Sequence, residues 1–117
     1  MFFVSRRFVC ERLGISPWAS YGFFSATESG LIPSDRVIAL LNRSRKAREL
    51  ELDFIPSDVV TAEELSERTG IPAKKLLAWT RRKKNVPPHF RMNKQTTRFR
   101  VSSFDEWTER RFRGRRG

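Results

Sequence analysis

The chain has 117 residues, a single cysteine, and 24 Lys and Arg against 13 Asp and Glu, which gives a net charge of +11. One cysteine excludes an internal disulfide and a cysteine-based metal site, and no apolar run reaches the roughly 18–20 residues of a membrane span. The opening Met1-Phe2-Phe3-Val4 is too short for a signal peptide and is followed by Arg6-Arg7. We therefore expect a cytoplasmic protein.

The basic charge is confined to the second half. Residues 1–59 hold 8 Lys and Arg against 7 Asp and Glu, whereas residues 60–117 hold 16 against 6. A mixed charged surface keeps proteins in solution, but it does not explain a surplus in one half only. Confined basic charge is typical of a site for a polyanion. The composition predicts that the second half binds nucleic acid.

Residues 1–42 carry the signals of three short helices. Ser5 and Ser16 suit helix N-caps, Pro17 suits a first helical position, and Gly14 suits the left-handed residue that ends a helix. A third helix is predicted from Ser34, and its apolar face holds Val37, Leu40 and Leu41. We expect a helix-turn-helix-like lobe without a wing.

The second of these helices carries the aromatic residues Trp18, Tyr21 and Phe24. Trp and Tyr are common anchors of protein interfaces, so these residues predict self-association or a protein partner. Two alternatives stay open: the rings pack against the rest of the chain, or the first lobe touches DNA directly. Residues 43–59 are predicted to be a charged linker.

Residues 60–112 predict a winged helix-turn-helix. Thr61-Ala62-Glu63-Glu64 is a capping box, and Gly70 ends the helix that it opens. Pro72 starts a second, basic helix over 73–84, with Leu76 and Trp79 inward. A short helix, a glycine turn and a basic helix are the arrangement that fits the DNA major groove.

The wing is predicted from the alternation of apolar and basic residues at 90–92 and 98–101, on either side of Asn93–Thr97. Phe90, Met92, Phe99 and Val101 are expected to face the core. Arg91, Arg98 and Arg100 are expected to face outward, with Lys94 at the tip. Ser103–Glu106 predicts a second capping box, opening a helix with Phe104 and Trp107 on one face. Residues 113–117 are predicted to be a basic, disordered tail.

The two halves resemble each other. A shift of 56 residues aligns Val4-Ser5 with Val60-Thr61, Gly14-Ile15 with Gly70-Ile71, and Phe23 with Trp79. Chance similarity between short helical patterns is the alternative. The fold class predicted is mainly α with a small β-hairpin wing: a tandem helix-turn-helix, whose second unit is winged.

From Thr61 to Trp107 the chain resembles the excisionase and AlpA-like regulators, which share the MerR-type winged helix. The resemblance covers about the last half of the chain, with a longer wing tip than is typical. The first half resembles a second copy without a wing. The resemblance implies double-stranded DNA binding by a small regulator or a recombination directionality factor of a phage or other mobile element. The matching residues are Thr61, Glu64, Leu65, Gly70, Ile71, Leu76, Trp79, Arg81, Arg82, Pro87, Arg98, Phe99, Arg100, Ser103, Phe104 and Trp107.

The predicted DNA-binding residues are all cationic. Those near the start of the basic helix, with Arg81, are expected to reach bases or phosphates. The later ones are expected to meet phosphates, which position without specifying sequence. The wing would follow the adjacent backbone or minor groove. The set is Lys74, Lys75, Arg81, Arg82, Lys83, Lys84, Arg91, Lys94, Arg98 and Arg100.

Nothing in the sequence indicates catalysis. His89, the single histidine, is expected to be exposed or to touch phosphate, and no phosphate loop or metal-ligand spacing is present. We expect no enzyme activity, no cofactor and no small-molecule substrate. Trp79 and Trp107 are expected to be core residues rather than a platform for single-stranded bases. Three functions compete: a sequence-specific transcription regulator, an excisionase-like factor that bends DNA, and a protein-interaction module such as an antiactivator.

Overall fold

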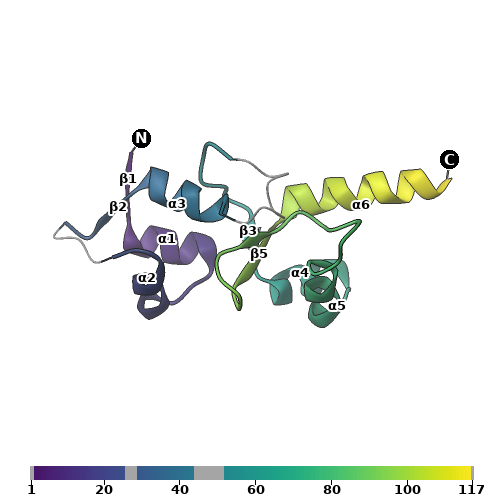
Figure 1. Ribbon diagram of the computed structural model, residues 1–117, viewed down its shortest axis with the longest axis horizontal. Helices are drawn as coiled ribbons and strands as arrows, with labels where there is room; N and C mark the ends of the chain where they lie inside the picture. Colours follow the sequence, from purple (N-terminus) through teal and green to yellow (C-terminus); the bar gives the residue numbers. More distant parts are fainter. Residues whose placement is uncertain (1, 26–28, 44–51, 117) are drawn as a thin grey trace.

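The computed structural model describes residues 2–25, 29–43 and 52–116, with the backbone alone at 112–116 (Figure 1). The first half contains β1 (Phe3–Ser5), α1 (Arg6–Leu13), α2 (Pro17–Phe23), β2 (Leu31–Pro33) and α3 (Ser34–Leu41). The second half contains β3 (Val59–Val60), α4 (Ala62–Thr69), α5 (Ala73–Trp79), β4 (Phe90–Arg91), β5 (Thr97–Arg100) and α6 (Val101–Arg116). No helix in these ranges has the length and apolar character needed to cross a membrane.

The described residues form six helices and two small antiparallel sheets, so the fold mixes α and β structure. One sheet pairs β1 with β2, and the other has the order β3-β5-β4. The prediction of a mainly helical chain with a β-hairpin is confirmed in part. The hairpin β4–β5 is present, but its second strand is the centre of a three-stranded sheet, and the first half has a sheet of its own.

The two halves share one order of elements: strand, helix, helix, strand, helix. The helices α1 and α4 begin 56 residues apart, as do α2 and α5. Each first helix ends at a glycine in the left-handed region, Gly14 at φ 64° and Gly70 at φ 77°. The repeat predicted from the sequence therefore matches the order of the elements. The strand β4 is the addition that distinguishes the second half.

Local capping signals are confirmed where the capping residue is close in sequence. The Ser5 and Ser16 hydroxyls accept hydrogen bonds from the backbone N–H groups of Phe8 and Ala19. The capping box of Thr61 and Glu64 is complete. These bonds satisfy N–H groups that have no partner within their helices.

The capping box predicted at Ser103 is wrong. Helix α6 begins two residues earlier, at Val101, directly after β5. Its first N–H groups are bound by Asp58: the Asp58 carbonyl accepts from Val101 at 3.1 Å, and the Asp58 carboxylate accepts from Ser102 at 2.9 Å. A distant aspartate therefore caps this helix. The helix continues to Arg116, and Gly117 lies outside the described residues.

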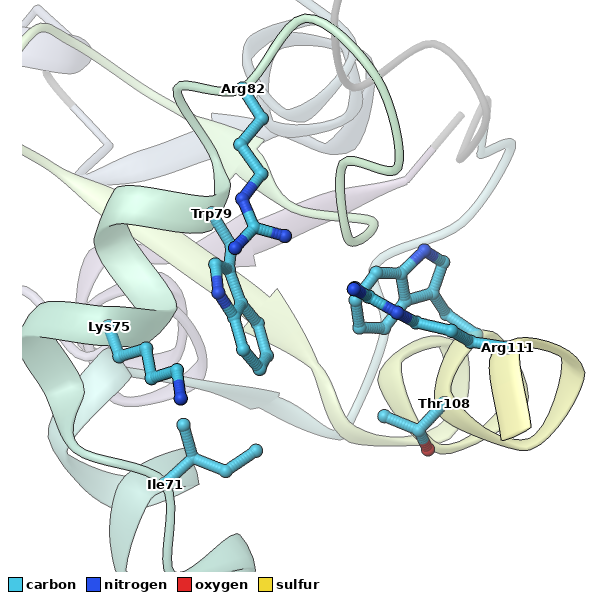
Figure 2. Close-up of a pocket in the computed structure, with 7 residues that line it drawn as sticks. Ile71, Lys75, Trp79, Arg82, Thr108 and Arg111 are labelled. Carbon is cyan, nitrogen blue, oxygen red and sulfur yellow. The ribbon is translucent and has the colours of Figure 1, made fainter. Parts of the chain in front are cut away.

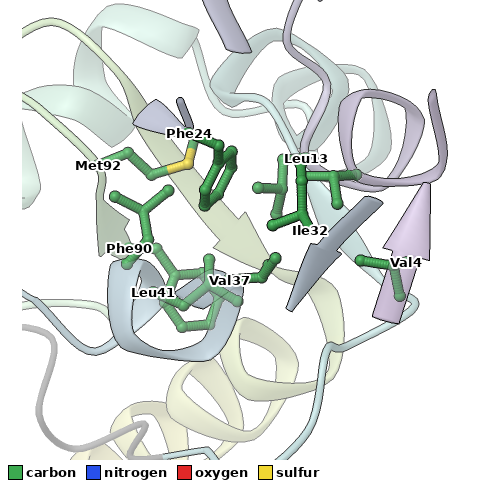
Figure 3. Packing of buried hydrophobic residues seen from close by; sticks show 10 residues of the cluster. Val4, Leu13, Phe24, Ile32, Val37, Leu41, Phe90 and Met92 are labelled. Carbon is green, nitrogen blue, oxygen red and sulfur yellow. The ribbon is translucent and has the colours of Figure 1, made fainter. Parts of the chain in front are cut away.

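Two clusters of buried side chains form the core. The first lies in the first half but includes Phe90 and Met92 from the second (Figure 3). The second is built from Ala62, Leu65, Leu76, Phe99 and Phe104. The packing thus crosses the predicted boundary between lobes, because β4 places its apolar side chains in the core of the first half.

The hairpin register explains this division. Phe90 pairs with Arg98, and Arg91 pairs with Thr97. Paired residues share one face of a sheet, and neighbours along a strand alternate between faces. Phe90, Met92 and Arg98 therefore face the first half, whereas Phe99 faces the second. The prediction that Phe90, Met92 and Phe99 face the core is confirmed, since all three are fully buried, but the two strands reach the core from opposite faces of the hairpin. Val101 is half-buried at the start of α6.

Hydrogen bonds and apolar packing hold both described ends of the segment between the halves. The Asn42 side chain donates to the carbonyl oxygen of Leu52 at 2.9 Å and accepts from its N–H at 3.2 Å. Leu52 and Ile55 then pack against the first core cluster. Of the predicted linker 43–59, residues 44–51 lie outside the described residues.

The molecule is elongated, with principal extents of 55 × 25 × 22 Å. The two halves lie along its long axis, and α6 reaches the far end (Figure 1). In this view α3 and α6 lie along the upper side and α2 and α5 along the lower side. The second helices of the two halves are therefore presented on the same side.

Candidate nucleic-acid interface

Helices α4 and α5 form a packed pair joined by a tight turn. The N–H of Gly70 donates to the carbonyl oxygen of Ser66 at 2.8 Å, and the N–H of Ile71 donates to the Thr69 hydroxyl at 3.2 Å. Leu65 and Leu76 are fully buried and belong to the same core cluster. This packing fixes which side of α5 faces the core. The opposite side carries exposed Lys74 and Lys75, the second and third residues of the helix.

Helix α5 is shorter than predicted. It ends at Trp79, and the buried Thr80 hydroxyl donates to the carbonyl oxygen of Leu77 at 2.6 Å. The N–H groups of Arg81 and Arg82 bond only three residues back, which tightens the chain into a turn. Arg81–Lys84 therefore lie on a turn after α5 rather than on the basic helix 73–84 that was expected.

Six cations of this segment are exposed and lack a carboxylate partner among the described residues. The ion pairs found there are Arg7 with Glu11, Arg100 with Asp58, and Arg110 with Glu106. A cation that no carboxylate neutralises contributes its whole charge to the local potential. The six are Lys74, Lys75, Arg81, Arg82, Lys83 and Lys84.

Arg98 does not face outward, which corrects the expectation for this residue. Its Nε donates to the carbonyl oxygen of Leu13 at 2.6 Å, and its Nη2 donates to that of Gly14 at 2.8 Å. The side chain is half-buried because it shares a hairpin face with Phe90. Burial lowers the pKa of Arg98, and the carboxylates of Glu63 and Glu64 partly offset this. Arg98 joins the two halves.

Arg100 is also engaged within the chain rather than free on an outer face. Its Nε donates to the Asp58 carboxylate at 2.7 Å, and its guanidinium lies 5.1 Å from the centre of the Phe54 ring. Burial by itself raises the pKa of Asp58, but hydrogen bonds from Ser102 and Arg100, with the charge of Arg100, lower that pKa below its usual value. The pair holds β5 beside the residues that precede β3.

The other two hairpin cations differ from each other. Arg91 is half-buried, and its Nε is buried without a hydrogen-bond partner among the described residues. Lys94 is exposed at the tip. The hairpin therefore presents one fully exposed cation of the four expected, because β4 and β5 pack against both halves.

Of the three aromatic residues predicted to form an interaction surface in the first half, two are exposed and one is buried. Trp18 is 87% exposed and Tyr21 is 53% exposed, and they line a shallow hollow with Ala19 and Gly22. The Arg6 guanidinium lies over the Tyr21 ring, 4.1 Å from its centre. Phe24 is only 3% exposed and packs in the first core cluster, so its place on the exposed face is corrected. The backbone becomes extended at Phe24, which turns this side chain inward.

His89 is fully buried, which corrects the prediction of an exposed or phosphate-touching imidazole. Its Nδ1 lies 2.9 Å from the carbonyl oxygen of Pro87, and its ring centre lies 6.5 Å from that of Phe99. The neighbouring strand β4 carries it into the interior. Within the described ranges, no three of the His, Cys, Asp and Glu side chains are grouped closely enough to hold a metal ion.

Trp79 and Trp107 both pack against the second core cluster, their ring centres 5.9 Å apart. Their core role is confirmed in part, because both side chains are only half-buried. No sequence pattern predicted the role of Arg111, whose guanidinium lies 5.8 Å from the centre of the Trp79 ring and 5.3 Å from that of Trp107. An arginine within a basic run carries no local signal that it will lie against aromatic rings.

Comparison with known proteins identifies no relative. No family model matches the chain, and no curated protein or solved structure is found to be similar to it. The function must therefore be inferred from the residues of this chain.

Proposed function

We propose that this protein binds double-stranded DNA sequence-specifically through α5 and the turn that follows it, and acts as a transcription regulator. The observation that carries the proposal is the group of six exposed cations between Lys74 and Lys84, for which the described part of the chain offers no carboxylate partner. Lysine and arginine side chains displace counterions from DNA phosphates, and this release supplies much of the affinity. Six exposed cations within a segment of eleven residues suit one continuous stretch of phosphate backbone.

The geometry of the α4–α5 pair supports groove binding. In a helix-turn-helix, the first residues of the second helix contact base edges, while the first helix crosses the backbone. Lys74 and Lys75 occupy the start of α5, and we expect the exposed turn residues Arg81–Lys84 to meet phosphates. On this proposal α5 is the recognition helix of a winged helix-turn-helix, and the first half is a related unit without a wing.

The hairpin exposes fewer cations than the sequence predicted, so we expect its contribution to DNA binding to be small. Arg98 and Arg100 are engaged inside the chain, and Lys94 is the exposed cation of the hairpin. The proposed DNA contact therefore consists of the six cations of the α5 segment with Lys94 beside them. Arg91, which is half-buried, is expected to contribute less.

Selection from a random duplex library at about 0.15 M salt tests the proposal. We expect one enriched motif, and we expect Lys74→Ala and Arg81→Ala to abolish the enrichment. Arg36→Ala is the matched control, because it removes one exposed cation from α3 in the first half. Weak binding to all sequences, reduced equally by all three changes, would contradict a sequence-reading interface.

The alternative from the resemblance is an excisionase-like factor of a phage or other mobile element. Such a protein would bind several adjacent sites and bend the duplex, whereas a simple regulator would occupy its operator without a large bend. Electrophoretic mobility of the complex, with the selected motif placed at the middle or the end of a fragment, separates the two. A position-dependent mobility supports bending.

The exposed Trp18 favours a second candidate function, a protein-interaction module such as an antiactivator. An indole that is 87% exposed is a candidate interface anchor. Equilibrium sedimentation of the whole chain tests self-association, the form of the hypothesis that needs no other protein. We expect Trp18→Ala and Tyr21→Ala to abolish a dimer that persists at high salt. A purely monomeric wild-type chain would remove the self-association hypothesis.

A further inference from the structure

A cleft separates α5 from the middle of α6, with a volume of about 270 Å³. Ile71, Lys75, Trp79 and Arg82 line it from the α5 side. Trp107, Thr108 and Arg111 line it from α6. Figure 2 shows Trp79 and Arg111 on opposite sides of the opening, with Arg82 reaching over it. The volume is just below the roughly 300–1,000 Å³ of drug-sized ligand sites, so it suits a single small ring system.

The walls of the cleft are aromatic and its charge is positive. The indoles of Trp79 and Trp107 are inclined at 50° to each other. The Lys75 Nζ and the Arg82 guanidinium lie 5.7 and 5.3 Å from the centre of the Trp79 ring. No lining residue is acidic. Flat apolar surfaces beside three cations fit a ligand that combines an aromatic ring with a negative charge.

Two of the lining residues carry donor atoms that are closed to solvent and lack a hydrogen-bond partner among the described residues. They are the Trp79 Nε1 and the Arg111 Nη1. A buried donor without a partner costs about 1–3 kcal/mol, so native proteins almost always satisfy such groups. An acceptor in the cleft can reach these atoms only if the side chains move, so the charge and the shape of the cleft carry the inference.

We propose that the cleft between α5 and α6 binds a small planar anion, a single aromatic ring system that carries a phosphate or a carboxylate. The ring lies against Trp79 and Trp107. The anionic group accepts hydrogen bonds from the Arg111 guanidinium. Lys75 and Arg82 add charge at the opening, and both also belong to the proposed DNA surface. An occupied cleft therefore neutralises part of that surface and weakens DNA binding.

Calorimetry on the whole chain without DNA tests the proposal directly, so its outcome does not depend on the proposed DNA-binding function. Adenosine 5′-monophosphate and indole-3-acetate are the probes. Adenosine supplies a ring without the anion, and inorganic phosphate supplies the anion without a ring. We expect at least one probe to bind with a Kd below about 1 mM, and both partial ligands to bind at least about tenfold more weakly.

Arg111→Gln is the informative variant, and Arg110→Gln is its matched control. The two arginines are neighbours on α6, but Arg110 is exposed, pairs with Glu106 and does not line the cleft. We expect Arg111→Gln to weaken the bound probe about tenfold and Arg110→Gln to leave it unchanged. Equal losses in the two variants would overturn the proposal, because they would indicate binding to diffuse charge.

Indole N–H resonances in nitrogen-15 spectra give a second readout. The chain has three tryptophans, and Trp18 lies in the other half, so its signal reports that the protein remains folded. We expect the probe to shift the Trp79 indole resonance and leave that of Trp18 in place. No binding of either probe below about 1 mM, or a Trp79 resonance that does not move at saturation, would overturn the proposal.

One comparison identifies the source of the ligand. A short deoxyadenosine strand with a 5′-phosphate carries the same chemistry at a DNA end. Tighter binding of this strand than of the mononucleotide would support the site with a strand terminus as its natural ligand. Equal or weaker binding of the strand would support the site with a free small molecule.

Discussion

The Nε atom of Arg98 and the carbonyl oxygen of Leu13 lie 2.6 Å apart, although 85 positions separate the two residues in the chain. The carbonyl groups at the end of a helix have no partners within it and form its negative pole. Arg98, which also bonds to Gly14, supplies a cation and donors there. The last turn of α1 and the central strand of the second sheet are thus held by one side chain.

Replacement of Arg98 should destabilise the protein. Hydrogen bonds that involve a charged group contribute about 1.5–3 kcal/mol each to stability. Because Arg98 is partly exposed, we expect Arg98→Ala to lower the free energy of unfolding by an amount near the low end of this range. Arg98→Lys should recover only part, because an ammonium does not reproduce the planar fork that reaches two carbonyls. Urea unfolding monitored by circular dichroism measures both. Lys94→Ala, at the exposed hairpin tip, is the control and should be near wild type.

Phe90 should stabilise both halves although it belongs to the second. Truncation of a buried phenylalanine costs about 3–5 kcal/mol, and Phe90 is fully buried in the first core cluster. We expect Phe90→Ala to lower the free energy of unfolding by that amount while the protein still unfolds in one transition. Phe3→Ala, at an exposed phenylalanine, should change it by less than about 0.5 kcal/mol. Two separate transitions in the wild type would contradict this account.

The cap of α6 predicts a pH dependence of stability. The pKa of Asp58 in the folded protein is below its usual value of 3.8. The stabilisation by the carboxylate is therefore complete above the unfolded-state pKa, and it disappears as the pH falls through the lower folded-state pKa. Asp58→Asn should lower the free energy of unfolding by about 1 kcal/mol at pH 7, which is typical for the loss of a helix cap. The difference between the variant and the wild type should shrink below pH 3.8.

Unfolding of the Asp58→Asn variant and the wild type at a series of pH values from 7 down to about 2 checks this. Asp53→Asn is the control, because Asp53 is exposed and caps no helix. A deficit that stays constant over the whole range would show that the amide disturbs packing rather than removing a charged acceptor.

The salt dependence of DNA binding should report which cations meet phosphates. Six contacts predict a slope of log K against log salt near −5, from about 0.9 per phosphate. Lys84→Ala should reduce the magnitude of the slope by about 1. Arg100→Gln should leave the slope unchanged, since Asp58 already binds that guanidinium. Fluorescence anisotropy with a labelled duplex gives the slopes, and an equal effect of both changes would place the hairpin arginines on the DNA.

Short-range features of the fold followed from the sequence. The caps at Ser5, Ser16 and Thr61 and the left-handed glycines depend on residues within one helical turn, and each is present. The internal repeat also predicted the shared order of elements. Such features are determined by bonds between neighbours, which a single sequence displays.

Features that depend on residues far apart in the sequence were not predicted. The face of each hairpin side chain is set by the pairing of Phe90 with Arg98, and the sequence alternation does not fix that register. The start of α6 is set by Asp58, 44 positions before Ser102. For the candidate site, the exposure of the α5 cations agreed with expectation. The sequence did not predict that Arg98 and Arg100 form hydrogen bonds within the chain, since their partners lie before residue 60.

The position of β4 also has a consequence for how the chain is made. Residues 1–43 are synthesised before Phe90 and Met92 have been added, yet these two side chains complete the core around Val37 and Leu41. The first half therefore leaves the ribosome with part of its apolar interior still open to water. Its folding should wait for the hairpin, so premature termination before residue 92 should yield an aggregation-prone product rather than a stable half-molecule.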